Sequence, residues 1–301
     1  MKLHKTKPFI VQKIWGSDKL AKLKGLSLVD LGETWEVSNL EEGPSQVNGK
    51  SLSELTTESE LPYLVKFIDT NDHLSVQVHP HDDYARMAEN SSGKTECWII
   101  LDSVEGAGIY LGFNENVSKE SFKKKVDSEK SVNEDLVFYP VKRGDFFLVP
   151  AGAIHAIGKG VTLVEIQQRS GITYRVWDWN RKDANGKGRE LHIEKAMDVL
   201  DFSSRFNSKE NFKNKKLVLN NNEKLISHKD FDVTCFYGEL DKGIEIKGRY
   251  LPSFVVLKGS LEIEVDEERI QVNEYESAIV LEKICKANIK ADKGSEWLLI
   301  D

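Results

Sequence analysis

Cysteine is scarce in this chain, which has only three cysteines among 301 residues. Cys97, Cys235 and Cys285 lie far apart and form no C-x-x-C pair. An odd, dispersed set argues against a disulfide framework and against a cysteine-based metal site. We therefore expect buried, reduced thiols and a cytoplasmic protein.

Long apolar runs and a basic excess are also absent. No stretch approaches the roughly 18 apolar residues of a membrane span, and the opening MKLHKTKPFIVQKIWG is basic without a long apolar segment. We expect neither a signal peptide nor contact with a membrane. The net charge of −7 argues against a nucleic-acid partner, which would require a clustered basic face. An anionic substrate must therefore meet a few local basic residues.

Short β-type segments separated by turns dominate residues 8–180. These segments are rich in Val, Ile and Phe: YLVKFID, LSVQVH, CWIILD, AGIYLGF, FFLVP and TLVEIQQ. Short strands without regular helical spacers predict a sandwich or barrel. Residues 115–135 have helical spacing, and Ile193, Ala196, Met197 and Leu200 predict a short amphipathic helix.

The pattern of residues along the chain changes near Asn180 and again near residue 216. NRKDANGKGRELH is polar and rich in turn residues, whereas β-type segments return from about 216 onward. We predict an N-terminal domain over 1–182, a linker with a short helix over 183–215, and a C-terminal β-domain over 216–301.

Four polar side chains stand out as candidate metal ligands: Gln77, His79, Glu96 and His155. Alternation along a strand places Ser75, Gln77 and His79 on one face. Together the four would form a mixed nitrogen and oxygen shell that suits zinc, with cobalt, manganese or ferrous iron as alternatives. Each residue alone is weak evidence, because a histidine on a strand is more often a hydrogen-bonded structural residue.

A strand that ends in a rigid turn before a single histidine carries the most specific signal. Gly144, Pro150, Gly152 and His155 match the second cupin motif, G-x5-P-x-G-x2-H, at every position. Five further stretches resemble the class I mannose-6-phosphate isomerases in their short bacterial form: IWG, GETWEVS, LSVQVHP, GKTECW and GITYRVWDWNR. The resemblance covers most of residues 8–180 and is looser beyond them.

This resemblance implies an enzyme that interconverts mannose 6-phosphate and fructose 6-phosphate at one bound zinc per chain. It implies Gln77, His79, Glu96 and His155 as the metal ligands. It also implies Arg175 as the catalytic arginine, Lys66, Ser75 and Lys94 with Arg175 as the lining of the sugar-phosphate pocket, and Glu165 as a carboxylate near the reacting carbons.

The proton carrier stays open between Glu165, Lys94, His81 and a metal-bound water. His81 and Asp82 follow Pro80 and are expected in a solvated turn. Alternation in TYRVWDW predicts that Trp177 and Trp179 share the face of Arg175.

The resemblance further implies two cupin-type β-barrel or jelly-roll domains with a few short helices, the second degenerate. KGSLEIEV resembles the start of a cupin motif, but the C-terminal segment lacks Q-x-H and P-x-G-x-x-H, and its one histidine is His228. We therefore expect a metal-free second domain, and a monomer or weak homodimer.

Two other functions compete with the isomerase. One is a different metallocupin, such as a ferrous dioxygenase or a cupin-type glucose-6-phosphate isomerase, and the other is a sugar-binding cupin without turnover. Lys66, Ser75, Lys94 and Arg175 favour the sugar-phosphate isomerase, because a dioxygenase does not require a phosphate clamp.

Overall fold

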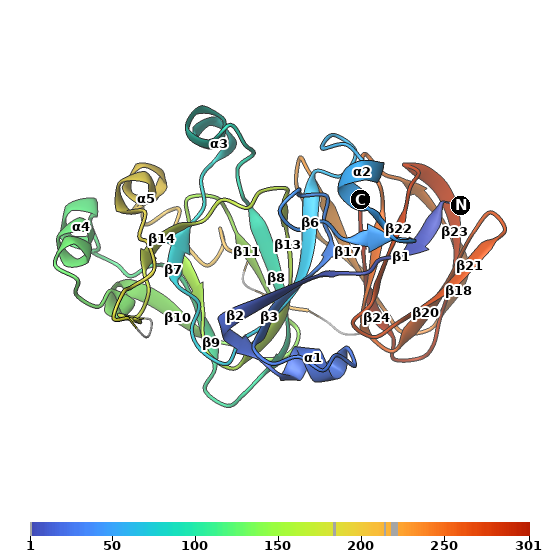
Figure 1. The fold of residues 1–301 in the computed structure, drawn as a ribbon, viewed down its shortest axis with the longest axis horizontal. Helices are drawn as coiled ribbons and strands as arrows, with labels where there is room; N and C mark the ends of the chain where they lie inside the picture. Colours follow the sequence, from blue (N-terminus) through green and yellow to red (C-terminus); the bar gives the residue numbers. More distant parts are fainter. Residues whose placement is uncertain (1, 183–184, 214, 218–221) are drawn as a thin grey trace.

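Two pairs of β-sheets lie side by side along the length of the protein (Figure 1). The computed structural model describes residues 2–182, 185–213, 215–217 and 222–301. Residues 183, 184 and 214 of the predicted linker and 218–221 of the predicted C-terminal domain lie outside that description. The mainly β architecture predicted from the sequence is confirmed.

The first pair of sheets, called here the N-terminal barrel, is wholly antiparallel. Its seven-stranded sheet contains, in spatial order, β15 (Lys215–Lys216), β11 (Asp145–Val149), β8 (Glu96–Ser103), β13 (Val161–Gln168), β6 (Tyr63–Asp69), β3 (Leu31–Val37) and β2 (Phe9–Ser17). Its five-stranded sheet contains β10 (Leu136–Pro140), β9 (Gly108–Phe113), β12 (His155–Ile157), β7 (Val76–Val78) and β14 (Tyr174–Trp177). Trp98 and Phe147 from one sheet share a buried cluster with Ile109 and Leu111 from the other.

The second pair, called here the C-terminal barrel, has six and four strands. The larger sheet contains β1 (Leu3–Lys5), β22 (Ser277–Val280), β19 (Ser253–Lys258), β24 (Glu296–Ile300), β17 (Asp232–Tyr237) and β16 (Glu223–Ser227). The smaller contains β18 (Leu240–Lys247), β23 (Ile284–Ala291), β20 (Ser260–Val265) and β21 (Glu268–Asn273). Strand β1 pairs with β22, so the start of the chain completes the second barrel. Both ends of the chain lie on that side of the molecule (Figure 1).

Short helices and one small hairpin decorate the sheets. They are α1 (Lys19–Leu23), α2 (Leu52–Leu55), α3 (Asp82–Glu89), α4 (Lys119–Asp127), α5 (Ile193–Val199), the 3-10 turn η1 (Asn133–Asp135), and the pair β4 (Gln46–Val47) and β5 (Lys50–Ser51). The helices predicted within 115–135 and over 193–200 are confirmed as α4 and α5. Asp82, expected in a solvated turn, instead begins α3 and is only partly exposed. Asp82 and Asp83 favour a helix start there, because their charge complements the helix dipole.

One hydrophobic core joins the two barrels. The outer face of the seven-stranded sheet supplies Cys97, Ile99 and Val164, and the six-stranded sheet supplies Val233 and Leu298 to the same buried cluster. The central strands of the N-terminal barrel are therefore buried on both faces, which explains why YLVKFID and TLVEIQQ are nearly continuous apolar runs. The domain boundaries at 182 and 216 stay a prediction. All three cysteines are free and buried, as expected.

No helix in the described part of the chain is long and apolar enough to cross a membrane.

Candidate active site

A cavity of about 260 Å³ opens inside the N-terminal barrel, and most of the predicted site residues surround it. Six of them form part of its lining: Lys66, Ser75, Gln77, Lys94, Glu165 and Arg175. The other three, His79, Glu96 and His155, form a buried group whose ligand atoms all lie within 4.8 Å of one another. Lys94 connects the two sets, because its Nζ lies 2.9 Å from Glu96 Oε2.

Strand register explains how residues distant in sequence meet at this point. His155 on β12 and Arg175 on β14 both pair with Gln77 on the intervening β7. Residues directly opposite each other in antiparallel strands point to the same face, so these three form a row across the sheet. Neighbouring strands lie about 4.8 Å apart, which places the Arg175 backbone roughly 10 Å from that of His155. Val76 and Val78 point to the opposite face and pack in another cluster.

The turn before His155 depends on glycine. Gly152 has φ of +88° and donates from its backbone N–H to the carbonyl of His79 at 2.9 Å. A side chain there would be strained by φ and would approach His81 Nε2 and the Val199 carbonyl to 3.1 Å. The turn therefore brings the strand of His155 directly against His79.

The spacing of the cluster fits a single ion. Glu96 Oε2 lies 3.5 Å from His79 Nε2, and Glu96 Oε1 lies 3.4 Å from His155 Nε2. Ligand atoms that share a zinc at about 2.0–2.2 Å in tetrahedral geometry are separated by roughly 3.2–3.6 Å. Among the described residues, no hydrogen bond reaches either carboxylate oxygen of Glu96, although Lys94 forms an ion pair with it. A buried carboxylate in this state has lone pairs left for a cation.

Hydrogen bonds behind the histidines orient their rings. His79 Nδ1 lies 2.8 Å from the carbonyl of Ile172, and His155 Nδ1 lies 3.0 Å from that of Ala153. A carbonyl only accepts, so each Nδ1 carries the proton and each Nε2 presents its lone pair to the cluster. Burial lowers the pKa of His155 to about 4, and burial followed by Lys94 lowers that of His79, so both rings are neutral at pH 7.

Gln77 reaches the same point through its amide. Gln77 Nε2 lies 3.3 Å from His155 Nε2, while Ser75 Oγ donates to Gln77 Oε1 at 3.3 Å. A half-turn of the terminal amide exchanges its oxygen and nitrogen, which would aim the oxygen at the cluster. Three candidate ligands therefore converge directly, and Gln77 adjoins them.

Glu96 and Glu165 are both buried, and their pKa values shift in opposite directions. Burial, with the nearby charge of Glu165, raises the pKa of Glu96 to about 7. Burial also opposes ionisation of Glu165, but Lys94 and Lys66 outweigh it and lower the pKa of Glu165. Trp98 Nε1 donates to Glu165 Oε2 at 3.0 Å and holds the carboxylate in place. The cavity thus contains an ionised carboxylate beside the candidate metal group.

Lys66 is buried between two carboxylates. Its Nζ lies 3.3 Å from Glu165 and 3.6 Å from Glu33, and 4.8 Å from the centre of the Trp35 ring. Burial disfavours its charge, yet Glu33 and Glu165 raise the pKa of Lys66. A lysine in the middle of an apolar run is therefore part of the site's charge network.

Arg175 lines the cavity, but the two tryptophans do not share its face. The register of β14 shifts between Arg175 and Trp177, and Trp177 packs in the outer cluster beside Val176. Trp179 lies beyond the end of β14, where its Nε1 donates to the carbonyl of Leu74. The prediction that both tryptophans share the face of Arg175 is therefore wrong, because a register shift interrupts the alternation of β14.

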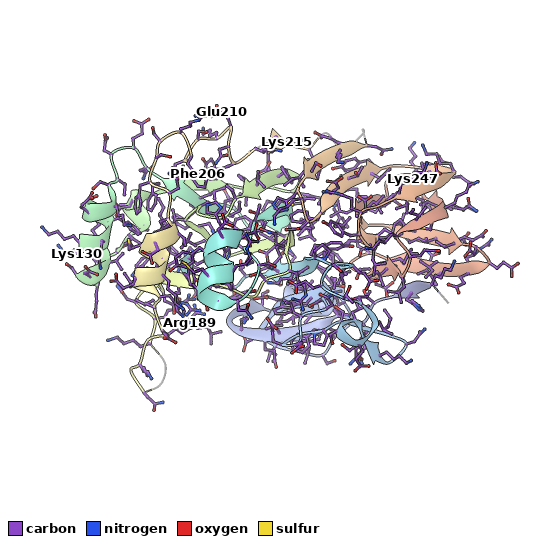
Figure 2. The ribbon with its side chains drawn as sticks, turned by 90° about the horizontal axis from the view of Figure 1, so that it is seen from above. Lys130, Arg189, Phe206, Glu210, Lys215 and Lys247 are labelled. Atoms are coloured by element: carbon purple, nitrogen blue, oxygen red, sulfur yellow. The ribbon has the colours of Figure 1, made fainter. Side chains whose placement is uncertain are left out.

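Arg189 was not predicted from the sequence, yet it lines the same cavity and lies near α5 (Figure 2). Its Nε donates to Asp178 Oδ2 at 2.7 Å, and its charge, after burial, lowers the pKa of Arg175. Arg189 falls in the segment interpreted as a polar linker, where no alternation could reveal its direction. Lys13, Trp15 and Glu33 also line the cavity without having been predicted to do so.

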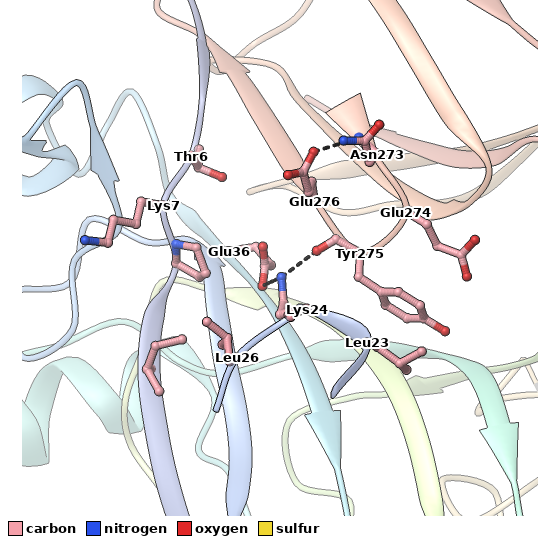
Figure 3. A pocket seen from close by; sticks show the side chains of 13 residues that line it. Thr6, Lys7, Leu23, Lys24, Leu26, Glu36, Asn273, Glu274, Tyr275 and Glu276 are labelled. Atoms are coloured by element: carbon pink, nitrogen blue, oxygen red, sulfur yellow. Dashed lines mark hydrogen bonds and ion pairs between the residues drawn. The ribbon is translucent and has the colours of Figure 1, made fainter. Parts of the chain in front are cut away.

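A separate cavity of about 460 Å³ lies where α1 meets the C-terminal barrel (Figure 3). Lys24 enters it and is paired with Glu36 at 2.8 Å and with the carbonyl of Tyr275. Lys24 therefore connects Glu36 of the N-terminal barrel with the Tyr275 carbonyl of the C-terminal barrel at this cavity.

Comparison with known proteins gives consistent matches. The model of the type I phosphomannose isomerase catalytic domain matches residues 5–97. A mannose-6-phosphate isomerase of Streptococcus mutans is 43% identical over 206 residues, which are 63% of this chain and 65% of that protein. The ManA mannose-6-phosphate isomerase of Bacillus subtilis is 40% identical over 216 residues, 66% of this chain and 68% of that protein. The aligned part is thus just under two thirds of the Streptococcus relative's length.

Solved structures resemble the whole chain. The mannose 6-phosphate isomerase of Bacillus subtilis has a TM-score of 0.82 at 27% identity, with all of both chains covered. A structure described as a putative mannosephosphate isomerase from Archaeoglobus fulgidus has a TM-score of 0.78 at 22% identity, over 99% of this chain and 97% of that one, and shows the fold alone. Because it is 40% identical to ManA of Bacillus subtilis over 68% of that protein, the chain belongs to the type I phosphomannose isomerase family.

Proposed function

We propose that the protein interconverts mannose 6-phosphate and fructose 6-phosphate. The observation that carries this proposal is the buried group of His79, Glu96 and His155 beside a cavity lined by Lys66, Lys94 and Arg175. Two neutral imidazoles and a carboxylate suit a divalent metal, and basic side chains suit an anionic sugar. Membership of the isomerase family supports the same substrate pair.

We assign the metal to His79, Glu96 and His155, with Gln77 as the fourth ligand after its amide turns. Zinc is the favoured ion, one per chain, because mixed nitrogen and oxygen donors and ligand spacings near 3.4–3.5 Å suit its tetrahedral shell. When bound, such an ion stabilises negative charge on the oxygens of the reacting carbons.

Isomerisation requires a proton to move from C2 to C1 of the sugar through an enediolate. Glu165 is the proposed proton acceptor, because it is buried, ionised and held by Trp98 and Lys66. Lys94 is the proposed donor to the substrate oxygens, since its Nζ lies between His79 and Glu96, where those oxygens approach. His81 is exposed and is not among the residues lining the cavity, so it is the weaker candidate.

The phosphate is proposed to lie at the opposite end of the row, beside Arg175 and Arg189. A six-carbon sugar phosphate has its reacting carbons and its phosphate at opposite ends, as His155 and Arg175 lie at opposite ends of the row. Guanidinium groups bind phosphate oxygens in pairs. Ser75, immediately before β7, and Lys66, in β6, both line the cavity and are proposed to contact sugar hydroxyls.

The protein is proposed to work in the cytoplasm as a monomer or weak homodimer. Its buried free thiols and acidic net charge support a soluble protein in a reducing compartment.

The test is a coupled assay that reports NADPH formation from mannose 6-phosphate before and after chelation. We expect activity to disappear with the metal and to return best with zinc. Activity that survives complete metal removal would overturn the metal assignment. Turnover of glucose 6-phosphate alone would identify a different isomerase, and metal binding without any turnover would identify a sugar-binding cupin.

A further inference from the structure

Gln168, the last residue of β13, connects the two barrels directly behind the site. Glu165 points into the cavity, whereas Gln168 lies three positions later and faces the opposite side of the sheet. The Gln168 side chain is only 2% exposed and uses both ends of its amide. Its position therefore gives it access to the C-terminal barrel from the strand that carries Glu165.

Three segments meet at the Gln168 amide. Its Oε1 accepts from Thr95 N–H at 2.7 Å, and its Nε2 donates to Asp230 Oδ2 at 2.7 Å and to Asp82 Oδ1 at 3.2 Å. The backbone N–H of Gln168 also donates to the Thr95 carbonyl at 3.0 Å. Thr95 lies between Lys94 and Glu96, Asp82 begins α3, and Asp230 belongs to the C-terminal barrel.

The segment on the site side is held at each residue. Gly93 N–H donates to Asp82 Oδ1 at 3.0 Å, and Lys94 N–H donates to the Pro80 carbonyl at 3.0 Å. Thr95 Oγ1 accepts from Ala151 N–H at 3.2 Å, in the turn that precedes His155. Positioning Thr95 therefore positions the strand of Glu96 and the turn of His155 together.

The segment on the far side is the turn between β16 and β17, residues 228–231. Lys229 Nζ lies 2.7 Å from Asp82 Oδ2 and 3.3 Å from Asp230 Oδ2, which balances the two acids around the Gln168 amide. Arg249 and Tyr250 donate to the Lys229 carbonyl, and Phe231 is fully buried in the shared core. The turn is thus a rigid part of the C-terminal barrel that bears on the site.

We infer that Gln168 is a positioning residue through which the β16–β17 turn of the C-terminal barrel holds Lys94, Glu96 and His155 in register. This inference rests on the proposed isomerase function for its activity readout. Its metal readout requires only that the His79, Glu96 and His155 group binds an ion. Groups that orient metal ligands from behind typically contribute 10–100-fold to metal affinity or activity.

The experiment compares two variants that cut this connection with one that cuts a different connection between the barrels. Gln168→Met keeps side-chain length but removes all three hydrogen bonds of the amide, and Asp230→Asn weakens the ionic side of the junction. The matched control is Glu296→Gln, because Glu296 in β24 accepts from Arg143 Nη2 at 2.6 Å and also joins the barrels. Each variant is measured for zinc affinity, kcat and KM, thermal unfolding, and amide hydrogen exchange over residues 93–96.

For Gln168→Met we expect about tenfold or greater loss of kcat and of zinc affinity, with faster exchange at 93–96. Asp230→Asn should show the same pattern more weakly, and Glu296→Gln should change thermal unfolding alone. Equal loss of kcat and zinc affinity in Glu296→Gln and Gln168→Met would overturn the inference. Unchanged exchange and zinc affinity in Gln168→Met would also overturn it. A wild-type protein that binds zinc without turnover would refute the proposed function, and the metal and exchange measurements would still decide the role of Gln168.

Discussion

The two barrels share one type of strand architecture but differ in what they bury. The N-terminal barrel buries several charged or titratable side chains around its cavity: Lys66, His79, Lys94, Glu96, His155 and Glu165. In the described part of the C-terminal barrel, the buried polar side chains are His4 of β1 and the serines Ser253, Ser277 and Ser295, and the barrel interior is filled by residues such as Ile263 and Trp297. Burying charge costs free energy unless it is paired, so a barrel retains it only where it has a use.

The two barrels therefore have different roles. The N-terminal barrel brings its charged side chains together by strand register, whereas the C-terminal barrel supplies an apolar face and one rigid turn. A barrel interior that contains charged as well as apolar side chains costs free energy to form. The apolar core shared with the C-terminal barrel, on the outer face of the seven-stranded sheet, offsets part of that cost. Substitutions can test whether chemistry and support are separated in this way.

The largest expected effect comes from replacing one histidine in each barrel by alanine. His155→Ala should abolish activity and lose the bound metal, because it removes a proposed ligand at the centre of the cluster. The matched variant His4→Ala, in strand β1 of the C-terminal barrel and outside the turn that contacts Gln168, should retain the metal and most of the activity. Metal analysis of the purified proteins beside the coupled assay measures both, and tight zinc binding by His155→Ala would remove that residue from the ligand set.

Arg175→Ala should lower turnover by about 100-fold or more while leaving the metal bound. The arginine lies at the far end of the row and is proposed to act on charge of the substrate. Arg175→Lys is the informative partner, since it retains the charge but not the planar fork of donors. The measurement is kcat and KM with metal content, and stoichiometric metal loss in Arg175→Ala would show that the arginine supports the metal group instead.

A smaller effect is expected from a matched pair of tryptophans. Trp98→Phe removes the hydrogen bond to Glu165, and a hydrogen bond to a charged group contributes about 1.5–3 kcal/mol, or roughly 10–100-fold in rate if it is all lost in turnover. Trp297→Phe alters a fully buried ring stacked on Phe236 at 4.1 Å, far from any proposed role. We expect Trp98→Phe to lower kcat and Trp297→Phe to leave kcat unchanged. Equal kcat losses would contradict the separation of chemistry and support.

Much of this arrangement could be predicted from local sequence. Alternation alone predicted that Gln77 and His79 share a face, and the Pro–Gly turn indicated how His155 enters the barrel. The family resemblance assigned Lys66 to the pocket, and Lys66 lines the cavity.

The rest depends on contacts between distant segments. Arg189 reaches the cavity from a polar stretch that has no periodic pattern of apolar residues. Its side chain is held by a hydrogen bond to Asp178. A register shift in β14 changes the face to which Trp177 points, and the alternation of residues along a strand does not predict such a shift. Gln168 gains its role only when the turn at Asp230 is brought against it by the shared core.

The smallest expected effect concerns the acid stability contributed by Asp178, which pairs with Arg189 and Arg181. Burial opposes ionisation of Asp178, but Arg189 and Arg181 outweigh it and lower its pKa below the ordinary 3.8. A carboxyl whose folded pKa is depressed adds stability above its unfolded pKa and loses that stability as pH falls through the folded value. Asp178→Asn should therefore be less stable than wild type at about pH 5–7, and the difference should shrink on acidification below about pH 4. Urea unfolding across this range measures the gap, and a gap independent of pH would mean that Asp178 acts through packing and not through the charge that orders Arg189 beside Arg175.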